Sequence, residues 1–346
     1  MSMKAVQFSG HGGRDVIEYT EREEPTRKEG EVLVDVKAAA LNHLDVWTRR
    51  GLPGIDLEMP HVPGSDAGGV VVEGGGTRFD KGDGVAVWAG VSCGECEFCR
   101  DGDEPLCVNY HLLGEHVEGV HAERIAVPAE NLVRVPEGVP WEKAAAAPLV
   151  FGTAWRMLVT RAGLRQGENV LVLGASGGVG HACVQIARNA GATVYATAGS
   201  DDKAKAARDL GAKEVFDYTD ENFAEGVREA TDGRGVDVVV DHVGKETWHD
   251  SLASLAKGGR VVTCGATTGG DATTDVNRIF WNQLTVLGST MATRGEVDDV
   301  LSLVWDGKME PRIRATLPMS EAAEGHRMLE ERDGFGKVVL VPDSET

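Results

Sequence analysis

The sequence predicts an α/β protein in which a strand-rich N-terminal region precedes a doubly wound domain with a parallel sheet. Three observations lead to this prediction. The chain has 346 residues, more than the roughly 250–300 that one hydrophobic core organises. From residue 164 onward, apolar strand-like runs alternate with helical stretches of about 10–15 residues, which is typical of right-handed βαβ units. A glycine-rich turn follows the first of these strands.

The elements can be assigned in chain order. Before residue 150 the clearest strand-like runs are EVLVDVKAAAL (31–41) and AGGVVVEGG (67–75). The parallel sheet is predicted from NVLVLGA, ATVYATAG, EVFDY, VDVVVDHVG, RVVTCGA and LTVLGST, which begin at 169, 192, 214, 236, 260 and 284. The intervening helices are GHACVQIARNAG, DDKAKAARDLGA, ENFAEGVREATDG and ETWHDSLASLAKGG. Two more helices (296–307 and 319–332) and the strand KVVLVP (337–342) end the chain.

The charge excludes some classes of function. With 55 acidic and 35 basic residues the net charge is −20, and no basic stripe is present for binding nucleic acid phosphates. The acidic residues are dispersed, which we interpret as halophilic adaptation to a salty cytosol. No apolar run approaches the roughly 20 residues of a membrane span, and no signal segment precedes the strand-like MKAVQF. We therefore expect a cytoplasmic protein with a small-molecule substrate and no nucleic acid or membrane partner.

The turn GASGGVG (174–180) joins a strand to a helix and predicts dinucleotide binding. Gly177 lets the backbone approach a pyrophosphate, and Gly180 allows close packing of strand and helix. Free N–H groups at the helix start would receive the negative charge. The turn departs from G-x-G-x-x-G because Ala175 occupies a glycine position, so the motif alone does not exclude other nucleotides or a merely tight turn.

Cofactor choice is predicted from the end of the second strand of the parallel sheet. An acidic residue there would bind the ribose 2′-hydroxyl of NAD, but this chain has Ala198, Gly199 and Ser200, with Lys203 nearby. This leaves room for a 2′-phosphate and favours NADPH, with NADH as the alternative. The adjacent aspartates, 201 and 202, are interpreted as capping the following helix.

Four of the six cysteines lie within residues 93–107. The spacing Cys93-x2-Cys96-x2-Cys99-x7-Cys107 supplies enough thiolates for one closed tetrahedral zinc shell, with no open position for catalysis. Iron–sulfur ligation and disulfide pairing are the alternatives. The two other cysteines, Cys183 and Cys264, are expected in the core.

Together the cysteine lobe and the glycine turn resemble the medium-chain dehydrogenase/reductase family, which is zinc-type alcohol dehydrogenase-like, and within it the quinone oxidoreductase-like branch. The resemblance covers nearly the whole chain, including LNHLDVW, HVPGSDAGGVV, AAPLVFGTAW and GKVVL. It implies a GroES-like catalytic domain over residues 1–150 with the zinc lobe at 93–107, a Rossmann domain over 151–289, and a segment over 290–346 that completes the catalytic domain. It also suggests a homodimer or homotetramer formed through the last Rossmann strand.

Metal-dependent members of the family hold a second, catalytic zinc. At the positions of its three ligands this chain has Asn42, Ser65 and Leu149, and Leu44 replaces the hydroxyl that relays the alcohol proton. Leucine cannot bind zinc, and the other two are poor substitutes for thiolate and imidazole. A rebuilt metal site is the alternative; its donors would be His43, Asp45, His61 and Asp66. Three histidines, at positions 111, 116 and 121, follow the cysteine lobe and are expected to be mostly exposed.

The resemblance also implies the other site residues. It places Asn42 and Trp47 near the nicotinamide and has Thr153 touch the nicotinamide. Asn42 is a candidate hydrogen-bond donor to a carbonyl or carboxamide group, with a purely structural amide as the alternative. The pyrophosphate would be lined by Ser176, Gly177, Gly178 and Val179. The adenosine ribose would be surrounded by Gly199, Ser200, Lys203 and Tyr218. The nicotinamide side would be contacted by Gly265, Thr267 and Ser289. Three aromatic residues, Phe151, Trp155 and Trp281, are expected in the core or in packing at a pocket or interface.

Three functions are consistent with the sequence. Without a Lewis acid, hydride transfer favours an acceptor that is already electron-poor, such as a quinone or an α,β-unsaturated carbonyl. The leading hypothesis is therefore an NADPH-dependent oxidoreductase of this type, carrying one structural zinc and no catalytic zinc. The second is an alcohol or sugar dehydrogenase with a rebuilt metal site. The third is a non-catalytic NADPH-binding protein.

Overall fold

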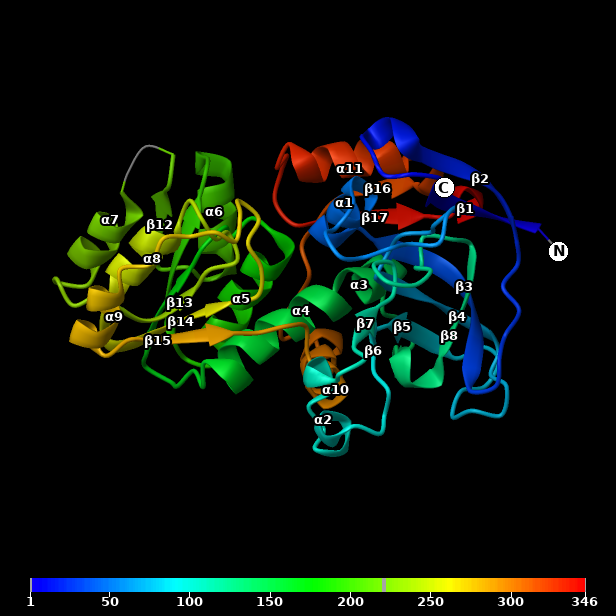
Figure 1. The fold of residues 1–346 in the computed structure, drawn as a ribbon, viewed down its shortest axis with the longest axis horizontal. Helices are drawn as coiled ribbons and strands as arrows, with labels where there is room; N and C mark the ends of the chain where they lie inside the picture. Colours follow the sequence, from blue (N-terminus) through cyan, green and yellow to red (C-terminus); the bar gives the residue numbers. More distant parts are fainter. Residues whose placement is uncertain (1, 220–221, 346) are drawn as a thin grey trace. The chain divides into compact units, whose positions relative to one another are not determined.

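The computed structural model describes residues 2–219 and 222–345, and within these it contains two compact units (Figure 1). The first unit comprises Met1–Leu149 with Ala292–Thr346, and the second comprises Val150–Met291. These boundaries lie one and two residues from those expected from the sequence. No helix of the described residues combines the length and apolar character needed to cross a membrane.

The first unit is organised around a seven-stranded sheet. Its strand order is β16-β17-β3-β4-β5-β9. Strand β8 lies off this path and pairs antiparallel with residues 31–35 of β3, whereas β17 pairs with Ala39 and Ala40 of β3. Because β17 pairs antiparallel with β3, the end of the chain is built into the N-terminal sheet. The strands of this sheet are β3 (Glu31–Ala40), β4 (Asp66–Glu73), β5 (Gly84–Val87), β8 (Arg124–Pro128), β9 (Leu132–Arg134), β16 (Ile313–Pro318) and β17 (Lys337–Val341).

Smaller elements complete this unit. Two-stranded sheets are formed by β1 (Ser2–Phe8) with β2 (Ile17–Glu23) and by β6 (Gly90–Val91) with β7 (His111–Leu112). The helices are α1 (His43–Arg50), α2 (Glu97–Arg100), α3 (Trp141–Ala146), α10 (Arg294–Trp305) and α11 (Ala322–Glu330). Helix α4 (Pro148–Trp155) carries the chain from the first unit into the second.

The second unit contains a six-stranded, fully parallel sheet of order β12-β11-β10-β13-β14-β15. The chain starts in the middle of this sheet, moves to one edge and then crosses to the other, which is the doubly wound topology expected from the βα rhythm. The strands are β10 (Asn169–Val172), β11 (Thr193–Ala198), β12 (Glu214–Asp217), β13 (Val236–Val240), β14 (Leu255–Thr263) and β15 (Thr285–Gly288). The helices are α5 (Gly178–Asn189), α6 (Asp201–Leu210), α7 (Phe223–Ala230), α8 (Trp248–Ser254) and α9 (Val276–Asn282).

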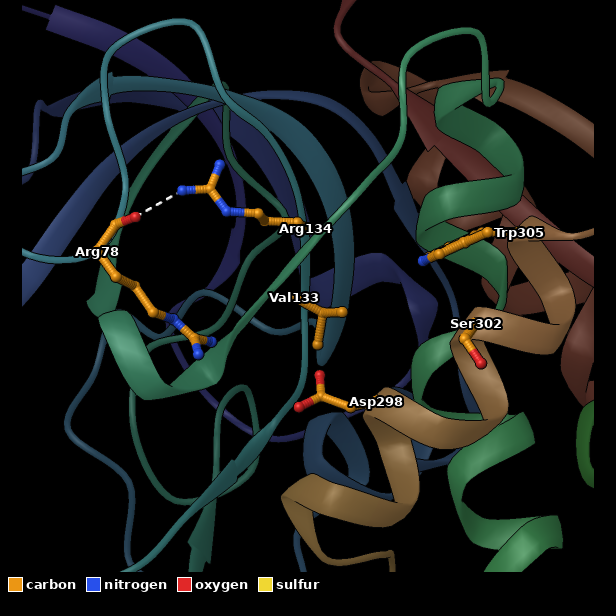
Figure 2. Close-up of a pocket in the computed structure, with 6 residues that line it drawn as sticks. All are labelled: Arg78, Val133, Arg134, Asp298, Ser302 and Trp305. Atoms are coloured by element: carbon orange, nitrogen blue, oxygen red, sulfur yellow. Dashed lines mark hydrogen bonds between the residues drawn. The ribbon is translucent and has the colours of Figure 1, made fainter.

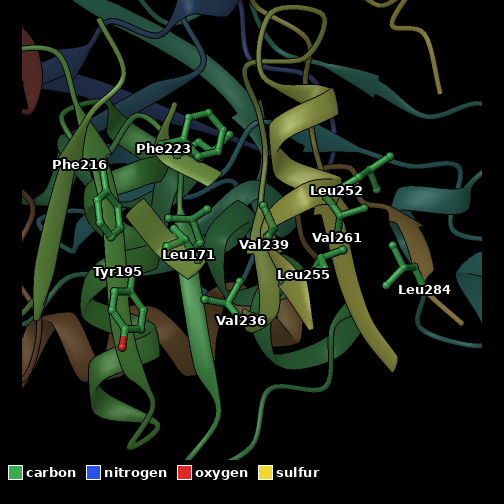
Figure 3. Packing of buried hydrophobic residues seen from close by; sticks show 12 residues of the cluster. Leu171, Tyr195, Phe216, Phe223, Val236, Val239, Leu252, Leu255, Val261 and Leu284 are labelled. Atoms are coloured by element: carbon green, nitrogen blue, oxygen red, sulfur yellow. The ribbon is translucent and has the colours of Figure 1, made fainter. Parts of the chain in front are cut away.

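The core of the second unit joins the sheet to its helices (Figure 3). Leu171 and Val239 come from central strands, and Phe223 and Leu252 from helices α7 and α8. All four are at most 4% exposed. Complete burial of such a side chain contributes about 1.5–3 kcal/mol, so this cluster holds the helices against the sheet.

Some local assignments were wrong. Helix α8 ends at Ser254, and LAKGG belongs to strand β14, which pairs with β13 through a register shift. Helix α9 and strand β16 were not predicted, although the apolar residues of α9 have a helical spacing and those of β16 alternate. The first residue of the predicted helix at 221–233 lies outside the described residues.

Candidate active site and metal centre

The first unit contains a buried polar cluster at the positions where the family resemblance would place the ligands of a catalytic zinc. Asn42 precedes helix α1, and its backbone N–H donates to Asp45 Oδ2 at 2.7 Å. The other carboxylate oxygen of Asp45 accepts from the N–H of Gly64 at 3.1 Å. Complete burial raises the pKa of Asp45 to about 7, despite these two donors. Asp45 therefore fixes the loop before β4 to the start of α1.

Lys337, the first residue of β17, lies at the centre of this cluster. Its Nζ donates to Asn42 Oδ1 at 2.5 Å and to Asp66 Oδ2 at 3.1 Å. Asn42 Nδ2 donates to the same oxygen of Asp66 at 2.9 Å. Lys337 is 3% exposed and Asp66 is fully buried, so this is an internal ion pair. The sequence analysis did not identify Lys337. The one available signal was a lone lysine at the start of an otherwise apolar strand.

The neighbouring polar groups are also engaged. Ser65 Oγ donates to the Leu113 carbonyl at 2.9 Å, and the N–H of Leu149 donates to Asp66 Oδ1 at 2.9 Å. His61 Nε2 lies 3.2 Å from the Gly114 carbonyl. Among the described residues, the four lobe cysteines are the one group of three or more metal-binding side chains with suitable separations. A catalytic zinc therefore does not fit at these positions, and the donors of the rebuilt site do not gather into a shell.

The expectation that His121 is exposed was wrong. Its ring is completely buried, and desolvation lowers its pKa to about 3. It packs against Gly64, where an added Cβ would lie 2.3 Å from the ring. The glycine-containing loop before β4 leaves space that the histidine fills, which the local sequence could not reveal. By contrast, His116 is exposed and His111 is half-buried.

The cysteine lobe has the geometry of a single-ion site. Its four Sγ atoms lie within 4.8 Å of one another, with Cys96 to Cys99 at 3.5 Å and Cys93 to Cys99 at 3.9 Å. A tetrahedral Zn–S length of about 2.3 Å gives a sulfur–sulfur distance of about 3.8 Å. Backbone N–H groups of Cys99 and Val108 lower the pKa of Cys96 to about 6, whereas burial and the neighbouring thiols raise the pKa of Cys99 to about 11.

The remaining cysteines lie in the second unit. Cys183 on α5 is buried, as expected. Cys264, which follows β14, is half-buried. Burial raises the pKa of Cys264 to about 12 and that of Cys183 above its usual value, so both thiols stay protonated at neutral pH.

The glycine turn of the second unit has the backbone geometry of an anion site. Gly174 adopts a positive φ of 56°, and Gly177 precedes helix α5 in an extended conformation. An added Cβ at Gly180 would lie 2.2 Å from the carbonyl oxygen of Gly174, whereas one at Gly177 would meet only that oxygen at 3.4 Å. Gly180 is therefore needed for packing, and Gly177 leaves open space before the first N–H groups of the helix.

The residues expected around the ribose lie after strands β11 and β12. Gly199 is covered by Tyr218, whose hydroxyl would lie 2.8 Å from an added Cβ. Ser200 is the N-cap of α6 and accepts from the N–H of Lys203 at 3.5 Å. The N-cap is thus Ser200 rather than Asp201 or Asp202, which occupy the first helical turn. No carboxylate precedes the helix at the end of β11.

The residues expected on the nicotinamide side follow the carboxyl ends of β14 and β15. The N–H of Ser289 donates to the Thr263 carbonyl at 2.8 Å, and Thr267 Oγ1 donates to the His242 carbonyl at 3.1 Å. Gly265 lies between Thr263 and Thr267 in sequence and is half-buried. In parallel sheets of this kind, ligands bind at the carboxyl ends of the strands, and the glycine turn lies at the same end of the sheet.

Two polar atoms of the second unit fit a missing ligand. Thr153 Oγ1 and Ser289 Oγ are buried and have no hydrogen-bond partner among the described residues. Buried hydroxyls are normally paired, so such groups need an explanation. A bound dinucleotide with a carboxamide is one partner that would satisfy them.

A separate pocket of about 480 Å³ lies in the first unit, between α10 and the loops at β9 (Figure 2). Arg134 donates to the Arg78 carbonyl at 2.6 Å, and Asp298 and Trp305 approach from α10. None of its lining residues was predicted as a site residue. The lining includes arginine side chains committed to protein partners, such as Arg134 to Asp83 and Arg78 to the Leu132 carbonyl.

Comparison with known proteins identifies the family. Residues 28–137 match the alcohol dehydrogenase GroES-like domain, and residues 178–306 match the zinc-binding dehydrogenase domain. Acryloyl-coenzyme A reductase of Sulfurisphaera tokodaii is 34% identical, covering 98% of this chain and 100% of the relative. Quinone oxidoreductase of Pseudomonas aeruginosa is also 34% identical, covering 98% and 99%.

A crystal structure described as an NAD-dependent alcohol dehydrogenase is 45% identical, with a TM-score of 0.95 and coverage of 98% of this chain and 99% of that one. A GroES-like domain combined with a Rossmann domain defines a class of nicotinamide-dependent dehydrogenases and reductases. The chain belongs to the medium-chain dehydrogenase/reductase family, and it is an NAD(P)H-dependent oxidoreductase.

Proposed function

We propose that the chain catalyses hydride transfer from NADPH to an activated acceptor, either an α,β-unsaturated carbonyl compound or a quinone, without a catalytic metal ion. The observation that carries this proposal is the buried cluster in which Asn42, Asp66 and Lys337 satisfy one another. A plain ketone or alcohol needs a Lewis acid to stabilise the charge that develops on oxygen. An enone or quinone spreads that charge over a conjugated system, so it reacts without one.

The names of several relatives support an activated acceptor. Besides the acryloyl-coenzyme A reductase, they include a 2-haloacrylate reductase of Burkholderia, 32% identical, and a crotonyl-CoA carboxylase/reductase of Cereibacter sphaeroides, 31% identical. Each of these names denotes a protein that reduces a carbon–carbon double bond next to a carbonyl. The structure described as an NAD-dependent alcohol dehydrogenase favours the second candidate, alcohol oxidation.

The residues of each unit would have distinct roles. The cofactor supplies the hydride. Gly177, Gly178 and Val179 would hold its pyrophosphate through backbone N–H groups, and Lys203 would face the 2′-phosphate. Thr153 and Ser289, whose hydroxyls are unpaired, would bind the carboxamide and set the ring orientation. Among the described residues no general acid is evident at the site. We therefore assign solvent as the source of the proton that the enolate or hydroquinone oxygen receives.

The structural zinc ion belongs to the proposal as well. Cys93, Cys96, Cys99 and Cys107 would hold it with four thiolates, leaving no open position. It would therefore stabilise the lobe and take no part in the reaction.

The function is tested by turnover and metal analysis of the purified protein. We expect NADPH oxidation with crotonyl-CoA or benzoquinone, lower kcat/KM with NADH, and about one zinc per chain. Oxidation of ethanol or benzyl alcohol should be slower by about 1,000-fold, since a catalytic metal is worth several kcal/mol. Alcohol oxidation as the main activity, together with two zinc ions per chain, would support the second candidate instead.

We also propose that two copies of the chain associate through the edge of the six-stranded sheet. Strand β15 is its edge, and Val276, Phe280, Trp281 and Val286 on α9 and β15 are 44–76% exposed. Trp281 was expected in the core or in packing at a pocket or interface, and its exposure in a single chain excludes only the core. Exposed apolar groups gathered at a sheet edge are typical of an interface.

Replacement of Trp281 with glutamate should therefore convert the oligomer into a monomer, because the charge would have to be buried without a partner. Light scattering coupled to size-exclusion chromatography measures the mass. The control is Ile313→Glu, which introduces the same charge at a 36% exposed position of the first unit and should leave the mass unchanged. A wild-type monomer would refute the proposed interface.

A further inference from the structure

We propose that the buried ammonium group of Lys337 is the resident cation of this active site, taking the place of the catalytic metal ion and positioning Asn42 and Asp66 for the reaction. The inference rests on the proposed function, because it concerns a reaction without catalytic metal. The residues named come from opposite ends of the chain, since Asn42 and Lys337 are 295 positions apart. The fold of the chain brings these distant residues together.

The position of Lys337 supports this inference. Asn42 and Leu149 stand where metal-dependent relatives have ligands, and Asp66 follows a third such position. All three contact one another or Lys337: Asp66 accepts from the N–H of Leu149, from Asn42 Nδ2 and from Lys337 Nζ. The ammonium group thus lies among the groups that replace the metal shell.

The charge of Lys337 supports it as well. Asp66 is fully buried, and an isolated buried carboxylate costs several kcal/mol unless it is paired. Lys337, 3% exposed, supplies the opposite charge. Desolvation sets the direction of the pKa shifts of Asp45 and His121, and the charge of Lys337 adds a smaller lowering to the pKa of each. The ammonium group therefore supplies the positive charge that the buried carboxylate of Asp66 requires.

The orientation of Asn42 also supports it. Lys337 Nζ holds Asn42 Oδ1 at 2.5 Å, which turns the amide nitrogen toward Asp66. Asn42 is also the N-cap of helix α1, the helix that carries Trp47. Both ends of the Asn42 carboxamide are therefore hydrogen-bonded inside the cluster. Because Lys337 holds one of these ends, Lys337 is a positioning residue for the start of α1.

The test is chemical rescue of Lys337→Ala. The substitution should lower kcat/KM for crotonyl-CoA or benzoquinone by about 10- to 100-fold through misplacement of α1, with the NADPH dissociation constant changed less than about twofold. Ethylammonium at about 0.1 M should restore at least about a third of the lost activity and raise the melting temperature. Equal concentrations of sodium chloride or 1-propanol should do neither. Lys257→Ala, at an exposed lysine, is the matched control and should behave as wild type.

The outcomes separate clearly. Lack of rescue by ethylammonium, or equal rescue by 1-propanol, would overturn the assignment, since charge would not be what the position requires. Rescue by added zinc would also overturn it, because the position would then be a latent metal site. If wild type lacks activity on both acceptors, the proposed function fails, while rescue of the melting temperature still tests Lys337.

A second variant covers failure of Lys337→Ala to fold. The double variant Lys337→Met/Asp66→Leu removes both charges, and apolar replacement of a buried pair is often tolerated where loss of one partner is not. We expect it to be more stable than Lys337→Met alone by urea denaturation. A double variant no more stable than the single one would show that Lys337 merely fills space.

Discussion

Replacement of Cys96 by serine is expected to remove zinc from the lobe and to lower the apparent melting temperature by about 10 °C, or roughly 3 kcal/mol. Serine cannot supply the thiolate, and three ligands would leave an open shell. The sulfur atoms lie as close as 3.5 Å without a disulfide, so the remaining thiolates would repel one another once the ion is lost. Zinc content by mass spectrometry and melting by circular dichroism measure the two effects.

The loss should stay local. The lobe is closed at its base by the pairing of β6 with β7, and the seven-stranded sheet does not pass through it. Treatment with a strong chelator should therefore make residues 93–107 sensitive to protease while the second unit stays protected. Cys264→Ser is the matched control, because this half-buried cysteine lies in the second unit. Unchanged zinc content in Cys96→Ser would contradict a four-cysteine site.

The features that the sequence predicted well are those encoded locally. The alternation of strands and helices after residue 164 is a periodic pattern, and it led to the six-stranded parallel sheet. The cysteine lobe is encoded within 15 residues, so spacing alone indicated a metal shell. The turn at 174–180 is similarly local, and the different roles expected for Gly177 and Gly180 agree with the space around each.

The features that the sequence did not reveal depend on distant contacts. The sequence shows directly that residues 42, 65 and 149 are poor metal ligands. No local pattern indicated that Lys337 would donate to both Asn42 and Asp66. The burial of His121 depends likewise on the loop at Gly64. Trp281 is a further case: it was expected in the core or in packing at a pocket or interface, and its exposure on α9, just before the edge strand β15, depends on the fold.

Substitutions in the glycine turn that add a single methyl group can distinguish an effect on cofactor binding from an effect on folding. Gly177→Ala should weaken NADPH binding at least about 10-fold, or about 1.4 kcal/mol, because the methyl group would occupy the space left for the pyrophosphate. The added Cβ meets only the Gly174 carbonyl oxygen at 3.4 Å, an ordinary contact, and the extended backbone at Gly177 accepts alanine. Titration by fluorescence and thermal melting should show weaker binding with an unchanged melting temperature.

Gly180→Ala provides the contrast, since its Cβ would lie 2.2 Å from the same carbonyl oxygen and would force the strand and helix apart. It should lower the melting temperature of the cofactor-free protein, by an overpacking cost of about 1–3 kcal/mol. Gly295→Ala, a helical position with nothing within 4 Å, should change neither property. If Gly177→Ala bound NADPH as tightly as wild type, the pyrophosphate would have to lie elsewhere, and the assignment of the anion site to the start of α5 would be wrong.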